Sequence, residues 1–480
     1  MKESGKPAEV TNHAREEIMT ITPEQLEAAI DGVLEARETH LAERPVAEII
    51  RVLDRVSRRF LRIGDPIRAA AIEGLCESSG YSTQMADAVV DGMAVTWRTS
   101  ALEALIREEF GDPRVLDMFV DRPGGESRLR VFGPRLTTHI FSGNVPGVSV
   151  ISMVRALLVK SASLGKTARA EPIMAPLFVT ALSEVDPGLG ACLAVRHWRG
   201  GDEALDSIAL SRAEAVIVYG SSGTVRSVRE RAPAGRPFLG YGHRVSLGVV
   251  AREALASEAH GRVLAGDVSR AIAMFDQRGC VSPHVVYVEE GGEITLERWA
   301  FMLGEALERL RTELPRGPVT AEQAAEIRQV RARAEFGELA GNGHQLFASD
   351  GTDWTVVVDP DPTFSASCLN RTISLRPVQS LDDVFPVIAP AASVLQTIAF
   401  AGPERRLVPF ATRAALLGAS RITSFRRMPW PAPEWHHDGR PVLRDLVRWC
   451  DLENLPSHGP APKGIMTGSN MPVTQPLERR

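Results

Sequence analysis

Short apolar segments alternate with helical stretches between residues 139 and 250, and this alternation restricts the fold of the chain more than any other feature. Strands separated by helices run parallel, because the helix carries the chain back across one face of the sheet. The segments expected to be strands are residues 139–142, 164–168, 193–198, 215–219 and 245–250. The sequence therefore predicts an α/β protein with a parallel sheet.

The same rhythm resumes after residue 280 and predicts a second α/β unit. Strands are expected at 285–288, 354–358 and 372–376, and helices at 296–314 and 321–336. A chain of 480 residues also exceeds the ~250–300 residues at which a single hydrophobic core stops growing. Two α/β domains that share an interface are the expected result.

The N-terminal part of the chain has a helical pattern. Thr22-Pro23-Glu24-Gln25 combines a capping hydroxyl, a proline at the first helical position and a glutamine three residues after the cap. A helix is expected to begin there and to run through Leu34. A second helix is expected after Pro45, and helical spacing continues over residues 67–110.

Two further segments interrupt the α/β pattern. Apolar alternation from residue 127 to 140 predicts a hairpin that turns at Gly133-Pro134. Beyond Met428 the chain is rich in proline, so we expect it to follow the surface and to end in a short helix at 443–449.

Charge and hydropathy exclude several classes of function. A formal net charge of -5 argues against a nucleic-acid binder that neutralises phosphates. Residues 1–20 are polar and lack the apolar core of a signal peptide, and the longest apolar stretch, 147–154, is cut by Arg155. We therefore expect a cytoplasmic protein without a membrane span.

The cysteines and histidines do not indicate a metal site or disulfides. The five cysteines are far apart and never form a CxxC pair, so reduced thiols are expected. His436-His437-Asp438 has metal-ligating residue types, but adjacent ligands without a third partner make a weak site. We predict no bound metal.

Cys280 is the cysteine with a setting suited to chemistry. It follows Gly279 in a loop that leads directly into a short β run, so the backbone can come close to a ligand. A thiolate is a strong nucleophile, and it can take an acyl group from one thioester and hold it as another. The alternative is a buried structural thiol, which is the commoner state of a lone cysteine.

Asn144 lies in the segment 141–147, Phe-Ser-Gly-Asn-Val-Pro-Gly, which ends a strand and opens an apolar helix. Its side-chain amide could donate a hydrogen bond to the oxyanion that forms when a thiol attacks an acyl carbon. The alternative is that Asn144 caps the following helix.

The chain resembles the aldehyde dehydrogenase superfamily and, within it, the LuxC-type fatty acyl-CoA reductases. The resemblance covers residues 141–380 and depends on four pieces in the same order: the Ser-Gly-Asn-Val-Pro-Gly segment, the Leu-Gly-Lys-Thr strand at 164–167, the Tyr-Gly-Ser turn at 219–221 and the Gly-Cys loop at 279–280. It implies a Rossmann-type cofactor domain, an α/β catalytic domain and a small bridging hairpin.

With this resemblance the chain divides into five parts. Residues 1–126 are the helical part of the cofactor domain, 127–140 the bridging hairpin, 141–255 the Rossmann-like domain, 256–428 the catalytic domain and 429–480 the tail. The hairpin resembles the superfamily's assembly element, so a homo-oligomer is expected.

The resemblance also implies roles for individual residues. Asn144 would be the oxyanion donor, Cys280 the nucleophile, Lys166 the contact to the cofactor ribose, and Gly220 and Ser221 the contacts to the pyrophosphate. The residues themselves agree with the last role, because the strand before Gly220 leads into a helix whose first N–H groups can face phosphate. Without the resemblance, that segment would be only a strand-to-helix turn.

Arg169 bears on the choice of cofactor. Many superfamily members have an acidic residue three positions after the lysine, where it suits the ribose hydroxyls of NAD, and this chain has Arg169 there. A guanidinium can bind a 2′-phosphate bidentately, through two parallel hydrogen bonds, and this favours NADP over NAD. The alternative is a solvated surface charge.

Hydrolytic aldehyde dehydrogenases have a glutamate that activates water, and the comparable stretch here, 238–244, reads Phe-Leu-Gly-Tyr-Gly-His-Arg. Without a base the acyl-enzyme should survive water, which favours reduction. We therefore expect NADPH-dependent reduction of a fatty acyl-CoA to the aldehyde through an acyl group on Cys280.

Several alternatives remain open at this point. The donor could be an acyl phosphate or a carrier-protein thioester, the reaction could be aldehyde oxidation, and the chain could be a non-catalytic acyl-binding subunit. By resemblance to the family, an acyl-transferring or acyl-activating protein partner is expected.

Overall fold

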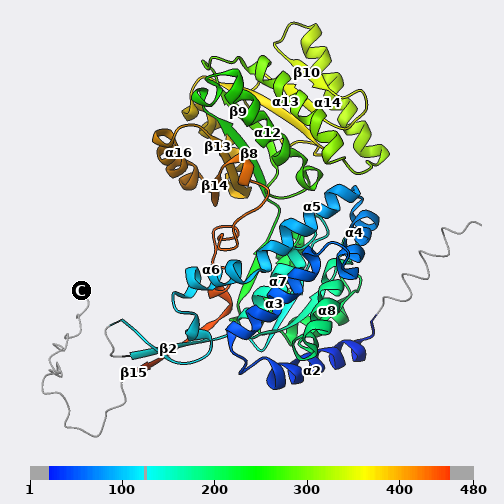
Figure 1. Cartoon of the computed structure of the whole chain (residues 1–480), viewed down its shortest axis with the longest axis vertical. Coiled ribbons are helices and arrows are strands. Elements are labelled where there is room, and N and C mark those ends of the chain that lie inside the picture. The colour runs from blue at the N-terminus through cyan, green and yellow to red at the C-terminus, as the bar shows by residue number, and fades with distance from the viewer. Residues whose placement is uncertain (1–20, 124–126, 454–480) are drawn as a thin grey trace, which may run out of the picture.

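The computed structural model describes residues 21–123 and 127–453, which form two lobes and a projecting three-stranded sheet (Figure 1). The N-terminal lobe contains a five-stranded sheet in the order β5-β4-β3-β6-β7, and the C-terminal lobe a seven-stranded sheet in the order β10-β11-β12-β9-β8-β13-β14. The prediction of an α/β protein with two sheets is therefore confirmed.

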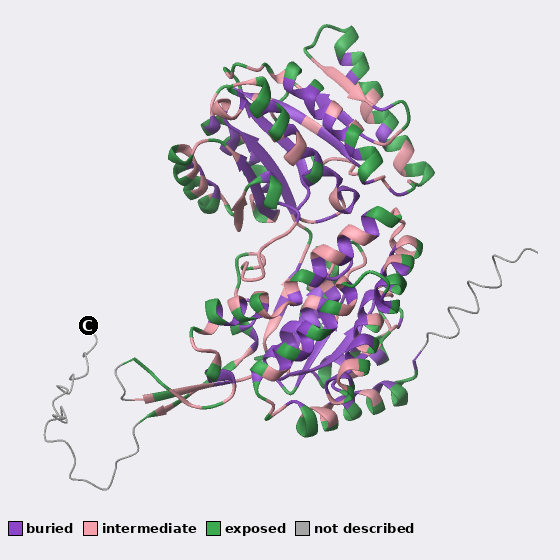
Figure 2. Ribbon diagram, viewed as in Figure 1, coloured by how far each residue is buried: buried purple, intermediate pink, exposed green. Residues whose placement is uncertain are grey.

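All neighbouring strands of the N-terminal sheet are parallel. The strands are β3 (Leu136–Ile140), β4 (Ala162–Lys166), β5 (Leu193–Arg196), β6 (Ala215–Tyr219) and β7 (Phe238–Tyr241). Alternate residues of β6 enter different cores, because successive side chains point to opposite faces of a sheet. Ile217 and Tyr219 join one hydrophobic core, and Val216 and Val218 join another. Figure 2 shows the sheet as a buried layer between the helices.

Helices cover both faces of this sheet. On one face lie α2 (Pro23–His40), α10 (Glu203–Ser211) and α11 (Ser222–Arg231). The other face carries the larger core, formed by α3 (Val46–Leu61), α4 (Pro66–Ser79), α5 (Thr83–Ala94), α6 (Thr99–Phe110), α7 (Val148–Leu158), α8 (Met174–Val185) and the short α9 (Pro187–Ala191). The capping box predicted for Thr22 and Gln25 is present, although α2 continues past Leu34.

The C-terminal sheet is parallel except for the pair β10 and β11. Its strands are β8 (Val245–Val250), β9 (Pro283–Glu289), β10 (Gln345–Ala348), β11 (Thr355–Val358), β12 (Thr372–Val378), β13 (Leu395–Ala401) and β14 (Arg421–Thr423). Helices α12 (Glu258–Ala273) and α13 (Leu296–Glu313) pack on one face, and α15 (Val384–Ile388) and α16 (Glu404–Leu417) on the other. Helix α14 (Ala321–Leu339) lies beside β10.

The predicted boundary between the two α/β domains is wrong by one strand. Residues 245–250 form a strand as expected, but β8 lies between β9 and β13 in the C-terminal sheet. Residues 242–244 alone join β7 to β8. Parallel neighbours in one sheet need a crossover of a dozen or more residues, so this short connection has to pass into the other lobe.

The predicted hairpin at 127–140 is also wrong. β2 (Ser127–Phe132) pairs antiparallel with β1 (Val120–Asp121) and β15 (Arg448–Glu453), whereas β3 belongs to the N-terminal sheet. Gly133 is required for a different reason than a hairpin turn, because a Cβ there would lie 1.8 Å from the carbonyl oxygen of Val159. The projecting sheet β1-β2-β15 is thus built from two distant parts of the chain.

Residues 429–447, which we call the strap, connect the C-terminal lobe with the N-terminal lobe (orange in Figure 1). Trp430 packs on α5 at Gly92, where a Cβ would lie 2.2 Å from the ring. Further along, the buried Glu109 carboxylate accepts backbone hydrogen bonds from Val442, Leu443 and Arg444 at 2.7, 2.9 and 2.7 Å. The helix expected at 443–449 is instead a 3-10 turn followed by β15.

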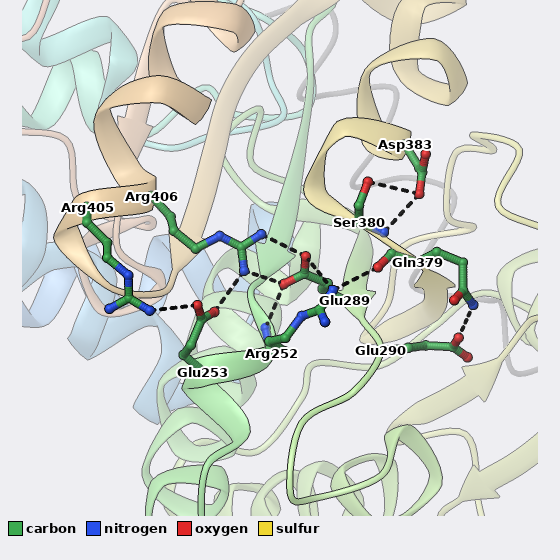
Figure 3. Close-up of polar contacts among 9 residues, drawn as sticks. All are labelled: Arg252, Glu253, Glu289, Glu290, Gln379, Ser380, Asp383, Arg405 and Arg406. Atoms are coloured by element: carbon green, nitrogen blue, oxygen red, sulfur yellow. Dashed lines mark hydrogen bonds and ion pairs between the residues drawn. The ribbon is translucent and has the colours of Figure 1, made fainter.

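A network of ion pairs closes the C-terminal sheet at the edge opposite Cys280 (Figure 3). Glu289, the last residue of β9 and 1% exposed, accepts hydrogen bonds from Arg406 at 2.6 and 2.7 Å and from Arg252 at 3.1 Å. Burial by itself would raise the pKa of Glu289, but the hydrogen bonds from the two arginines outweigh it and lower the pKa to about 2. The network ties β8, β9 and α16 together.

Glu289→Gln is expected to lower the free energy of unfolding at pH 7 by about 3 kcal/mol, the usual cost of breaking a buried ion pair. A carboxyl group whose pKa is lowered in the folded state adds stability that is complete above its ordinary value near 4.5 and disappears as the pH falls toward 2. The difference between wild type and variant should therefore shrink below pH 5. Urea unfolding at several pH values measures it, with Glu290→Gln on the exposed neighbour as control; a difference independent of pH would contradict the prediction.

Candidate active site

Residues from both lobes line a cavity of about 600 Å³. The N-terminal lobe contributes the segments that follow β3, β6 and β7, which meet at one edge because the strands are parallel. The C-terminal lobe contributes the loop before β9, with Cys280. Four of the residues predicted from the sequence therefore line one cavity: Asn144, Gly220, Ser221 and Cys280.

A second, smaller cavity of about 170 Å³ meets the first one at Cys280. Val145, Val148, Tyr219, Gly279, Cys280 and His437 line both cavities. The remaining wall of the small cavity is largely apolar. It comes from α5 and the turn after it, from α7, from the loop before Cys280 and from the strap, and includes Met93, Trp97, Ile151, Phe275, Trp430 and Trp435. Cys280 thus lies where the large cavity joins a smaller apolar pocket.

The loop that carries Cys280 has an unusual backbone. Phe275, Asp276 and Gln277 have φ values of 57, 49 and 66°, a left-handed conformation that side chains other than glycine rarely adopt. The facing residues 369–371 are left-handed as well. Residues remain in this conformation only where many surrounding contacts hold them in it, because the conformation costs about 1–3 kcal/mol for each residue.

Buried polar contacts between the two left-handed segments supply that constraint. Arg371 donates to the Asp276 carboxylate at 2.8 and 3.2 Å, and both side chains are almost completely buried. The Gln277 amide donates to the carbonyl oxygens of Pro283 and Thr372 and accepts from the Thr372 N–H. These contacts hold the backbone before Cys280 in one conformation.

The Cys280 thiol is protonated at neutral pH. Burial raises its pKa to about 11, and the Asp438 carboxylate adds to this rise, while hydrogen bonds from Gln396 and from the N–H groups of Cys280 and Val281 work against it. The residue is nevertheless only half-buried and lines both cavities. This position does not fit the alternative of a thiol sealed in a core.

The alternative role for Asn144 is wrong. Helix α7 begins at Val148, and its N-cap residue is Gly147 with φ 88° and no side-chain capping hydrogen bond. A Cβ at Gly147 would lie 1.9 Å from the sulfur of Met93, so glycine is needed there for space as well. Asn144 is exposed on the wall of the large cavity.

The turn after β6 has the features of a phosphate site. Ser221 caps α11, and its hydroxyl accepts the Thr224 N–H at 3.1 Å. Gly220 donates its own N–H to Tyr241 at 3.1 Å, which fixes the turn against β7. The first N–H groups of a helix have no partner within it and carry the positive end of the helix dipole, so they suit the pyrophosphate of a dinucleotide.

Lys166 and Arg169, which were predicted as cofactor contacts, are not among the described residues that line the large cavity. Lys166 ends β4, where its Nζ donates to the buried Asp206 carboxylate at 3.0 Å. Trp198 and Arg231 bind the same carboxylate, each at 2.8 Å. Arg169 is exposed in the loop after β4. To contact the ribose of a cofactor, Lys166 would have to break its hydrogen bond to Asp206 and donate to the ribose hydroxyls instead.

The described residues that line the two cavities include no carboxylate. Tyr241 and His243 belong to the stretch in which hydrolytic aldehyde dehydrogenases have a glutamate. Both residues lie in the wall of the large cavity. His284 is held neutral, because burial lowers its pKa to about 4, and its Nδ1 accepts the Ser367 N–H at 3.2 Å. A carboxylate that could activate water, like the glutamate of hydrolytic relatives, is therefore absent among these lining residues.

Sequence reasoning missed two side chains at the site and misjudged a third. Gln396, the second residue of β13, and Trp435 in the strap line the cavities without any local motif. His437 had been considered only as a metal ligand. It stacks between Tyr241 and Trp435 at ring distances of 4.2 and 4.8 Å.

No group of three or more histidine, cysteine, aspartate or glutamate side chains in residues 21–123 and 127–453 could hold a metal ion. In the same ranges, no helix is both long and apolar enough to cross a bilayer.

Solved structures with the same fold are aldehyde dehydrogenases. A benzaldehyde dehydrogenase from Corynebacterium glutamicum, described as NAD-dependent, has a TM-score of 0.66 and 15% identity, with 90% of this chain and 91% of that chain covered. The glyceraldehyde-3-phosphate dehydrogenase GapN from Methanocaldococcus jannaschii, in complex with NADP, has a TM-score of 0.66 and 12% identity, covering 90% and 94%. The chain thus has the aldehyde dehydrogenase fold, which is found with either cofactor.

Relatives with similar sequences have a common description. A long-chain acyl-protein thioester reductase from Photobacterium leiognathi is 23% identical over 447 residues, or 92% of this chain and 88% of that protein. The corresponding Vibrio harveyi protein is 24% identical over 418 residues, or 86% and 84%. The family of acyl-CoA reductases (LuxC) matches residues 41–449, including every residue of the site described above. The chain therefore belongs to the acyl-CoA reductase (LuxC) family.

Proposed function

We propose that this protein reduces a long-chain fatty acyl thioester to the aldehyde with NADPH, and that Cys280 carries the acyl group between the two half-reactions. The observation that supports this most directly is the position of Cys280, where a cleft with a helix N-terminus meets an apolar pocket. A cofactor can approach from one side and an acyl chain from the other.

The acyl transfer uses residues of this chain alone. The Cys280 sulfur attacks the thioester carbonyl and forms a new C–S bond, the bond to the donor sulfur breaks, and the thiol proton ends on the departing thiol. The Asn144 amide and the Cys280 N–H would donate to the oxyanion during this step. The described lining residues include no carboxylate that could activate water against the acyl-enzyme, and this favours reduction over hydrolysis.

The large cavity fits a nicotinamide dinucleotide. Gly220, Ser221 and the first turn of α11 would hold the pyrophosphate. Lys166 would contact the ribose after leaving Asp206. Arg169 favours NADPH, because a guanidinium suits a 2′-phosphate. When bound, NADPH would supply the hydride for the acyl carbon. Release of the aldehyde then breaks the C–S bond, and the Cys280 thiolate takes a proton from solvent.

The identity of the acyl donor is the finer part of the proposal. The family is described by acyl-CoA reduction, whereas the relatives are described as acting on acyl-protein thioesters. We favour acyl-CoA and retain a carrier-protein thioester as the second candidate. In either case the apolar pocket favours a hydrocarbon chain over a polar acyl group. We also propose a cytoplasmic homo-oligomer that receives its acyl groups from an acyl-transferring or acyl-activating protein.

Mass spectrometry of the intact protein after mixing with acyl donors, without NADPH, tests the function. A long-chain acyl-CoA should add one acyl group, located on the peptide that contains Cys280, and later addition of NADPH should remove it and yield the aldehyde. Acyl phosphate and acyl-carrier protein tested in parallel identify the donor. An absence of adduct with every donor, or an adduct on another cysteine, would overturn the proposal.

A further inference from the structure

Gln396 connects the Cys280 sulfur to a charged pair. It lies on β13, is completely buried and lines the large cavity together with Cys280. Its Nε2 donates to the Asp438 Oδ1 at 2.7 Å. The amide is also near enough to the sulfur to oppose the rise in the pKa of Cys280 that burial causes. Asp438 accepts from the Arg244 Nε at 2.9 Å on its other oxygen. Hydrogen bonds thus link Arg244 through Asp438 to Gln396, which lines the large cavity together with Cys280.

Asp438 determines which end of the amide is used. An ionised carboxylate only accepts hydrogen bonds, so it selects the nitrogen end of the Gln396 amide and fixes the orientation of that amide. Arg244 in turn is anchored by the Ser393 carbonyl oxygen at 3.0 Å. The Gln396 Oε1 is buried without a partner among the described residues. Buried polar atoms without partners are rare in proteins. Here Asp438 binds the nitrogen of the amide, and the oxygen therefore points where it has no donor among the described residues.

We propose that Gln396 is a positioning residue for the nucleophile: Asp438, held by Arg244, orients its amide so that the nitrogen donates to the Cys280 sulfur. This inference rests on the proposed function and deepens it. The amide would hold the sulfur in place as negative charge develops on it, both before attack on the acyl carbon and when the aldehyde departs.

The other charged and titratable groups around the sulfur do not duplicate this contact. Arg421 of β14 is coupled to Cys280 electrostatically, but its guanidinium donates to the carbonyl oxygens of Met428 and Arg427. His437 is kept neutral by burial, which lowers its pKa to about 4. The remaining groups of this kind in the wall of the large cavity are Tyr219, Tyr241, His243, Arg278 and His284.

Alkylation of Cys280 by iodoacetamide at a series of pH values tests the inference without any acyl donor. The chain has five cysteines, so the Cys280 peptide is quantified by mass spectrometry. Below the pKa of the thiol, the rate follows the thiolate fraction, and one pKa unit is tenfold. Gln396→Leu should slow the labelling of Cys280 about three- to tenfold at pH 8 and move its profile to higher pH.

Two further variants separate orientation from simple proximity. Asp438→Asn removes a negative charge near the sulfur and should speed the labelling. In that background Gln396→Leu should have a smaller effect than in the wild type, because residues that act through one another are not additive. Thr397→Val is the matched control, since Thr397 follows Gln396 on β13 and its buried hydroxyl has no partner among the described residues.

The outcomes are distinct from those of the reductase assay. An unchanged Cys280 profile in a folded Gln396→Leu protein, or strictly additive effects with Asp438→Asn, would overturn the positioning role. Neither result depends on acyl transfer. Conversely, a protein that never accepts an acyl group could still show the Gln396 effect, and then only the proposed function would fail.

Discussion

Cys280→Ala is expected to lose both acyl transfer and aldehyde formation, by about four orders of magnitude or more. The two half-reactions share one sulfur, so no acyl-enzyme can form and no acyl carbon is presented for reduction. Cofactor binding should remain, because the turn at Gly220 and Ser221 lies in the other lobe. Acyl adduct formation, aldehyde production and NADPH fluorescence titration measure the three properties separately.

Cys450→Ala is the matched control for this variant. Cys450 is a half-buried thiol on β15, in the projecting sheet, and it lines neither cavity. The control should keep full activity. A Cys280→Ala protein that still formed aldehyde at a rate near that of the wild type would remove the mechanism proposed above.

Asn144→Ala is expected to lower kcat about 10²–10³-fold, the usual effect of losing one oxyanion donor. The loss should appear in the rate of acylation, with little change in KM, because the amide would interact with charge that exists only during the reaction. Folding should be unaffected, since Asn144 does not cap α7. Pre-steady-state measurement of acyl adduct formation gives the relevant rate.

Asn342→Ala controls for the loss of an exposed amide, because Asn342 lies in the turn after α14 and away from both cavities. If Asn144→Ala kept more than a third of the wild-type acylation rate, the oxyanion would have to be stabilised by backbone N–H groups alone.

Local patterns in the sequence predicted much of the fold and of the site. Apolar segments with turn residues between them marked β6 and β8 at their observed bounds, because burial of a strand on both faces leaves a continuous apolar run. Cys280, Asn144, Gly220 and Ser221 were predicted as site residues, and they line one cavity. Each of them stands in a loop directly after or before a strand, which is where parallel sheets place ligands.

Long-range contacts decided the features that the sequence did not predict. The strand β8 lies in the second sheet, and β2 pairs with a strand more than 300 residues away in the chain. An alternating pattern of apolar residues predicts a strand but does not identify the strand it pairs with. The pairing depends on which strand edges lie next to each other in the folded chain. The predicted hairpin failed for this reason.

The sequence by itself determined the types of secondary structure and the residues capable of chemistry, since both depend on neighbours within a few positions. Only the tertiary structure decided the surroundings of the nucleophile. The strap supplies His437 and Asp438 and β13 supplies Gln396, and these approach Cys280 from parts of the chain more than 100 residues away. The pKa of the thiol depends on distances through space, so it follows from the folded arrangement of these groups and not from their order in the chain.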